Sequence, residues 1–224
     1  LKSGRHSLKI SSCGKFGLYA LRLSPVWRVL PSELWDVLGP FPSDYEPEGQ
    51  TAPVKRAMDT AFPPEFEFKP ESSYLGLDGR KISWTWSSER LGNHSDSGVN
   101  FPFRCDLRAG VSYARTLLDS HCDMEVQALL GCDWWCNVFL NGKLVKTGRD
   151  NSLDSAAFCG WKPMPMSLKL RKGENTLLVK CHKGSTMQWF TFYLNAPDSF
   201  VSIGSELKKL ECVKQSRQLK SIAS

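Results

Sequence analysis

The stretch 131–142 constrains the fold of this chain more than any other, because it predicts a strand that ends in a tight turn. Its residues alternate between two faces, with Cys136, Val138 and Leu140 on one and Trp135, Asn137 and Phe139 on the other. Asn141-Gly142 then gives the strongest short-range hairpin signal, since both residues tolerate positive φ. A second alternation over 124–130 predicts a half-buried strand. We therefore expect three consecutive antiparallel strands in this region.

Strand-like segments recur along the rest of the chain. Further strands are expected at 35–38, 81–86, 111–117, 167–170, 176–181 and 189–194. Two prolines keep 161–166 out of a central strand. The proline-rich stretch 43–73 is expected to wrap the surface as an irregular loop, with a short helix near 54–60. Together these segments predict an all-β, antiparallel β-sandwich.

The 224 residues suffice for a full hydrophobic core, and one main domain over 24–204 is the economical interpretation. Residues 1–23 repeat the design of 170–194, so we expect them to be the end of a preceding, similar β-sandwich domain. The alternative is that 1–23 add strands to the main sandwich. Residues 205–224 are expected to form a charged tail or helix, because Ser205-Glu206 can cap a helix that is rich in lysine.

The net charge of +6 does not describe the main domain. Five of the 29 basic residues lie in 1–23 without an acid, and five lie in 205–224 beside two acids. The remaining 19 basic and 21 acidic residues give 24–204 a net charge of −2, which disfavours a nucleic-acid partner. No run of about 18 apolar residues is present, so no membrane span is expected.

The sequence contains no pattern of residues that is typical of a catalytic or metal site. Its four histidines are scattered, and none belongs to a His-Glu-x-x-His motif. Neither a Gly-x-Ser-x-Gly elbow nor a phosphate-cradling loop occurs. The eight cysteines include no Cys-x-x-Cys pair, and Cys136 and Cys181 fall at core positions, where thiols act as small hydrophobic groups. We therefore expect no catalytic residue and no required cofactor.

Several turn and core motifs resemble one family of β-sandwich modules. These motifs are Trp35-Asp-Val-Leu-Gly-Pro-Phe41, Tyr113-Ala114, Leu130-Gly-Cys-Asp133, Val138-Phe-Leu-Asn-Gly-Lys-Leu-Val145 and Leu170-Arg-Lys-Gly-Glu-Asn-Thr-Leu-Leu-Val-Lys180. Over roughly 27–196, the chain looks like the galactose-binding-domain-like jelly-roll modules of large bacterial carbohydrate-active or secreted multidomain proteins. The resemblance implies an extracellular or periplasmic location and neighbouring domains in the same protein, with a structural calcium ion as an option.

One departure from that family concerns the turn after 131–132. Trp134 stands where such modules commonly carry a second acid, so a role that needs paired acids is not expected here. Asp133 is then expected to serve its turn, by bonding nearby backbone amides.

Eight tryptophans are many for this length, and an indole ring can stack on the apolar face of a sugar. Trp35, Trp84 and Trp86 are expected to fill the sandwich instead. Trp135 is the best candidate for an exposed ring, because it is out of phase with the core residues of its strand. The predicted ligand-binding residues are Trp134, Trp135, Asn137, Arg149, Asp150 and Trp161. Core packing or ordinary loop polarity is the competing interpretation for each of them.

Two functions of different class are consistent with these features. The first is a non-catalytic carbohydrate-binding-like module, which binds a glycan or polysaccharide and tethers or supports a neighbouring catalytic domain. The second is a purely structural accessory domain without a small ligand. A part of a glycoside hydrolase ranks third, because sequence spacing cannot reveal two carboxylates placed across a sugar ring. The chain itself is expected not to be an enzyme.

Overall fold

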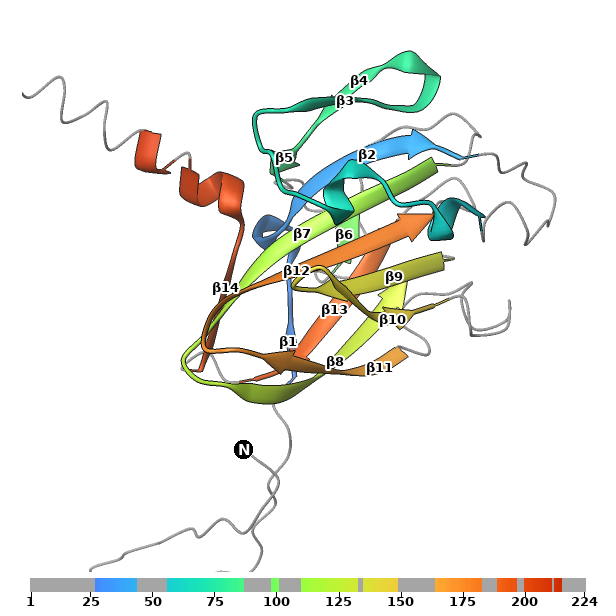
Figure 1. Ribbon diagram of the computed structural model, residues 1–224. Helices are drawn as coiled ribbons and strands as arrows, with labels where there is room; N and C mark the ends of the chain where they lie inside the picture. Colours follow the sequence, from blue (N-terminus) through green and yellow to red (C-terminus); the bar gives the residue numbers. More distant parts are fainter. Residues whose placement is uncertain are drawn as a thin grey trace, which may run out of the picture.

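Alternating apolar residues, separated by turn-forming ones, fold this chain into stacked β-sheets. The computed structural model describes residues 27–43, 56–86, 98–100, 110–132, 135–148, 164–182, 189–196, 200–210 and 212–214. They contain a five-stranded sheet, a seven-stranded sheet and a small separate hairpin (Figure 1). Every strand pair among them is antiparallel, which confirms the predicted all-β sandwich. Residues 1–23 lie outside the described residues.

In neither sheet do the strands lie side by side in the order in which they occur in the sequence. The five-stranded sheet runs β1 (Arg28–Val29), β13 (Trp189–Asn195), β8 (Met124–Cys132) and β11 (Met164–Leu170), with β6 (Gly98–Asn100) beside β13. The seven-stranded sheet runs β10 (Lys143–Thr147), β9 (Trp135–Leu140), β12 (Gly173–His182), β7 (Gly110–Ser120), β2 (Asp36–Pro42) and β5 (Thr85–Trp86), with β14 (Val201–Gly204) beside β7. The small hairpin pairs β3 (Ser73–Leu75) with β4 (Lys81–Ser83).

Short helical turns complete the described elements. Three are 3-10 turns, η1 (Ser32–Leu34), η2 (Pro63–Glu65) and η3 (Leu77–Gly79). The α-helical residues are 56–59, 206–210 and 212–214. The first of these agrees with the short helix predicted near 54–60, and the others agree with the predicted C-terminal helix.

The predicted Asn-Gly turn joins β9 to β10. Asn141 and Gly142 both take positive φ, at 51° and 75°, as a tight two-residue hairpin requires. Asn141 also ties this hairpin to β12, because its Oδ1 accepts a 2.9 Å hydrogen bond from the amide of Thr176. The turn therefore fixes both the hairpin and its register against the next strand.

The strands β8 and β9 follow one another in the chain but do not pair. β8 pairs with β11 and β13 in the five-stranded sheet, whereas β9 pairs with β10 and β12 in the other. The expectation of three consecutive paired strands is therefore wrong between β8 and β9. The chain changes sheets there because Leu130 of β8 and Cys136 of β9 bury their side chains in the same core from opposite sides.

The main core lies between the two sheets and is built from the alternating residues of both. Trp35 is fully buried in it, with its ring centroid 5.0 Å from that of Phe190 in an edge-to-face contact. Cys136 and Cys181 are both fully buried and face each other in register, as their core phase predicts. Pro165 lies in β11, which has one pairing partner among the described strands, so Pro165 does stay at a sheet edge, whereas Pro163 lies outside the described residues.

A second apolar cluster covers the outer face of the seven-stranded sheet. Residues 56–68, here named the strap, pass over that face and contribute the buried side chains of Ala57 and Met58. The ring of Phe62, also in the strap, lies 4.9 Å from that of Phe41 in β2. The expectation that 43–73 only wraps the surface is therefore wrong for the strap, because the sheet presents apolar residues on both faces and needs cover on both.

Candidate functional site

One end of the seven-stranded sheet gathers the ends of five strands. His182, the last residue of β12, is in register with Val111 of β7 on one side and Trp135 of β9 on the other. Ser43, which follows β2, shares a 2.7 Å hydrogen bond between its Oγ and His182 Nε2. Gly148, which follows β10, donates its amide to Cys136 at 2.6 Å. We name these strand ends, Ser43, Val111, Trp135, Gly148 and His182, the rim.

Four of the six predicted ligand residues, Trp134, Arg149, Asp150 and Trp161, lie outside the described residues. The described residues that adjoin them nevertheless lie together. Trp134 is followed by Trp135, and Arg149 is preceded by Gly148, both of which belong to the rim. A Cβ built on Gly148 would lie 3.1 Å from Cε of Met164, the residue at which the chain is described again after Trp161. The described residues that flank these segments therefore lie in one small region.

The other two predicted ligand residues are buried. Only 9% of Trp135 is exposed, so the expectation of an exposed ring at the hairpin edge is wrong. Asn137 is 4% exposed, and its Nδ2 donates to the Met58 carbonyl of the strap at 3.3 Å. The alternation of β9 did place both side chains on the outer face of the sheet. That face is not open to solvent at Asn137, because the strap covers it.

A charged side chain lies at the centre of this covered face. Lys180 of β12 is fully buried, in register with Asn137 on one side and Tyr113 on the other. Its Nζ donates to the carbonyls of Met58 and Thr60 at 2.9 and 2.6 Å and to Glu65 Oε1 at 2.9 Å. This cluster is not among the predicted features, although a lysine inside the apolar run 177–181 is a signal of it.

Tyr113 completes the buried polar cluster. Its hydroxyl donates to Glu65 Oε1 at 2.5 Å. Burial raises the pKa of Tyr113 far above its ordinary value, and the neighbouring Glu65 carboxylate raises it further. Tyr113 therefore stays protonated, and Glu65 accepts hydrogen bonds from both the phenol and the ammonium group.

A second acid, Asp36, joins the C-terminal helix to the same sheet. Its carboxylate is fully buried and accepts hydrogen bonds from the Ser205 hydroxyl and from the amides of Glu206 and Leu207, the latter two at 3.0 and 3.4 Å. Burial raises the pKa of Asp36, and those hydrogen bonds together with the charge of Arg115 oppose the rise. Arg115 forms an ion pair with Glu206, which fastens the start of the helix from the other side.

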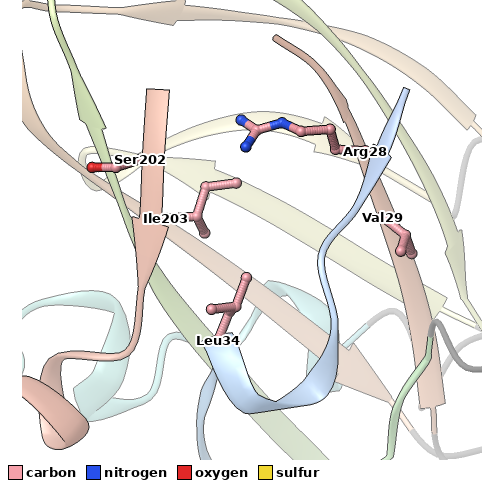
Figure 2. A pocket seen from close by; sticks show the side chains of 5 residues that line it. All are labelled: Arg28, Val29, Leu34, Ser202 and Ile203. Carbon is pink, nitrogen blue, oxygen red and sulfur yellow. The ribbon is translucent and has the colours of Figure 1, made fainter. Parts of the chain in front are cut away.

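A shallow cleft lies toward the opposite end of β7 from the rim, since β14 pairs with 117–120. It has a volume of about 500 Å³, and Figure 2 shows its lining. Arg28 extends from β1 over the apolar side chains of Leu34 and Ile203, and its Nη2 donates to the Val201 carbonyl at 3.0 Å. Arg28 thus links the edges of the two sheets at this cleft. Nothing in the sequence pattern distinguishes these residues beforehand.

No three His, Cys, Asp or Glu side chains of the described ranges lie close enough together to hold a metal ion. No helix in the described part of the chain is long and apolar enough to cross a membrane.

Comparison with known proteins gives no family for this chain. No family model matches the sequence, and no curated protein matches it. Among solved structures, the chain is similar to a β-glucosidase from Kluyveromyces marxianus in complex with glucose, at 18% identity and a TM-score of 0.32 over 40% of this chain and 11% of that one. It is also similar to the GH31 α-xylosidase from Xanthomonas citri, at 11% identity and a TM-score of 0.29 over 79% of this chain and 20% of that one.

Both similarities are too low to carry an argument about fold or function. This chain corresponds to only 11% and 20% of the lengths of these two proteins. The activities in their names are those of these two proteins.

Proposed function

We propose that this chain is a galactose-binding-domain-like module of a larger protein, which binds a glycan without catalysing a reaction and supports a neighbouring catalytic domain. The observation that carries the proposal is the rim. Its strand ends adjoin the segments that hold Trp134, Arg149 and Asp150, and Met164, close to the rim, follows the segment that holds Trp161. Stacking rings and hydrogen-bonding side chains from several strand connections are what recognition of a sugar requires.

The rim lies at one end of the seven-stranded sheet, whose two faces are already covered. The outer face of the seven-stranded sheet is occupied by the strap, and its inner face is occupied by the main core. Loops carried on a rigid scaffold commonly hold binding residues, and here the scaffold is the register of β7, β9 and β12. A module of this kind raises the local concentration of its partner enzyme at the polysaccharide, which would place the parent protein outside the cell.

The experiment is retention on a panel of insoluble polysaccharides and glycans, compared between the parent chain, Trp134→Ala and Trp161→Ala. Trp27→Ala is the matched control, since Trp27 is 38% exposed and precedes β1 near the far end of β13. We expect the parent and Trp27→Ala to be retained on the polysaccharide. At least one of the other two variants should no longer be retained, while its melting temperature stays unchanged. No retention of the parent on any member of the panel would refute a glycan-binding function.

A second candidate is a structural accessory domain without a small ligand. The burial of Trp135 and the use of the Asn137 amide by the strap favour it, because both residues then serve the fold alone. The same retention assay separates the two candidates. A folded parent that binds no glycan, beside a catalytic domain that loses stability when this chain is deleted, is the result expected for the structural domain.

A further inference from the structure

The ammonium group of Lys180 sits in a cage of oxygen atoms. Two backbone carbonyls of the strap, at Met58 and Thr60, lie 2.9 and 2.6 Å from Nζ. A carboxylate oxygen of Glu65 lies 2.9 Å from it. A lysine ammonium has three N–H donors and no acceptor, so each donor has an oxygen partner. Glu65 supplies a negative charge opposite the buried Lys180.

Aromatic rings complete the surroundings of this cation. The Phe62 ring centroid lies 5.3 Å from Nζ and the Tyr113 ring centroid lies 5.8 Å from it, distances at which a ring face attracts a cation. These three oxygen ligands come from the strap, whereas Lys180 comes from the sheet. The strap residues therefore surround a cation, and the sheet supplies that cation.

We propose that the strap oxygens of Met58, Thr60 and Glu65 form an internal binding site for a primary ammonium ion, and that this chain fills the site with its own Lys180. The strap closes over the outer face because the site is filled. The accepting oxygens belong to the strap backbone and to Glu65, so they persist when Lys180 is shortened. An emptied site then accepts a small alkylammonium ion from solution.

The test is chemical rescue of Lys180→Ala, with thermal unfolding and hydrogen exchange of the strap amides as readouts. In a sodium salt, the variant is expected to melt about 5 to 15 °C below the parent, because a buried carboxylate is left without its cation. In methylammonium or ethylammonium chloride at equal ionic strength, we expect a large part of this loss to be recovered, together with slow exchange in the strap. The parent is expected to show no such difference between the salts.

Two control variants sharpen the test. Lys180→Met fills the space without a charge, so it is expected to lose stability and gain nothing from alkylammonium ions. Lys69→Ala removes an exposed lysine that directly follows the strap and pairs with Glu67 of the strap, and it is expected to change neither readout. A Lys180→Met chain as stable as the parent would overturn the proposal, as would a Lys180→Ala chain that melts alike in all salts.

A chain that fails to fold after Lys180→Ala in sodium salt still gives an answer. Recovery of the folded state in alkylammonium salt supports the proposal. If Lys180→Ala does not fold in any salt, a second variant, Glu65→Gln, tests the proposal in its place. That change keeps Lys180 and removes the negative ligand, whose side chain is 12% exposed. We expect faster exchange of the strap amides and a lower melting temperature, and a Glu65→Gln chain indistinguishable from the parent would overturn the proposal.

Discussion

Replacement of Trp135 by alanine is expected to destabilise the fold rather than remove a stacking platform. Trp135 is 9% exposed at the first position of β9, with His182 opposite it in register. A buried tryptophan hides about 150 to 250 Å² of surface, which at about 25 cal/mol per Å² corresponds to roughly 4 to 6 kcal/mol as an upper estimate. Core truncations of Phe or Trp to Ala cost about 3 to 5 kcal/mol, in agreement with that estimate.

The assay is thermal and urea unfolding of Trp135→Ala beside the parent. For a chain of this size, about 1 kcal/mol lowers the melting temperature by about 2 to 4 °C, so we expect a drop of roughly 6 to 20 °C. Leu144→Ala is the matched control, because Leu144 lies on the same hairpin and is 51% exposed. It should change the free energy of unfolding by well under about 1 kcal/mol. If both variants behave alike, the assignment of Trp135 to the interior is refuted.

Three further predictions concern the scaffold. In urea unfolding, Gly39→Ala should lower the free energy of unfolding by about 2 to 6 kcal/mol, since φ is +146° and the new Cβ would lie 2.6 Å from Ser112 Oγ. Gly79→Ala is the control, because Gly79 has φ of +71° but open space around the new Cβ, and it should lower the same free energy by only about 1 to 2 kcal/mol. Asn175→Ala should lower the free energy of unfolding by about 2 to 4 kcal/mol, because the fully buried amide makes hydrogen bonds of 2.8, 2.9 and 3.1 Å to neighbouring backbone groups. An Asn175→Ala chain as stable as the parent would contradict that role. Burial raises the pKa of Asp36 above 3.8, so the folded state binds the proton more tightly than the unfolded state does. As the pH rises above 3.8, the parent should therefore lose stability relative to Asp36→Asn, which unfolding at several pH values measures.

Most strands could be predicted because their signals are local. The alternation of Cys136, Val138 and Leu140 and the positive φ of Asn141 and Gly142 depend only on neighbouring residues, and the structure confirms both. The assignment of β8 and β9 to different sheets could not be predicted in this way. It depends on which distant strands compete for each edge, and the sequence of one connection does not contain that information.

The expectation that Trp135 is exposed was wrong for a similar reason, and Asn137 is also buried. Period-two alternation correctly placed Asn137 on the face away from the main core, but it cannot tell whether another segment covers that face. Met58, which is 79 residues away in the sequence, accepts the Asn137 amide. Lys180 was the available clue, since a lysine among apolar neighbours on a central strand implies partners from elsewhere in the chain.

The covered face and the rim can be perturbed separately, which makes the two proposals independent. Loosening the strap by Lys180→Ala leaves the register of β9 and β12 unchanged, because backbone pairing from Trp135 to Leu140 holds these strands together. We therefore expect Lys180→Ala to keep the glycan retention of the parent at temperatures where it remains folded, although its strap amides exchange faster. Loss of retention in that folded variant would instead place the ligand on the outer face of the sheet, with the strap as part of the site. Retention that survives Lys180→Ala and disappears in Trp134→Ala or Trp161→Ala would leave the rim as the binding surface.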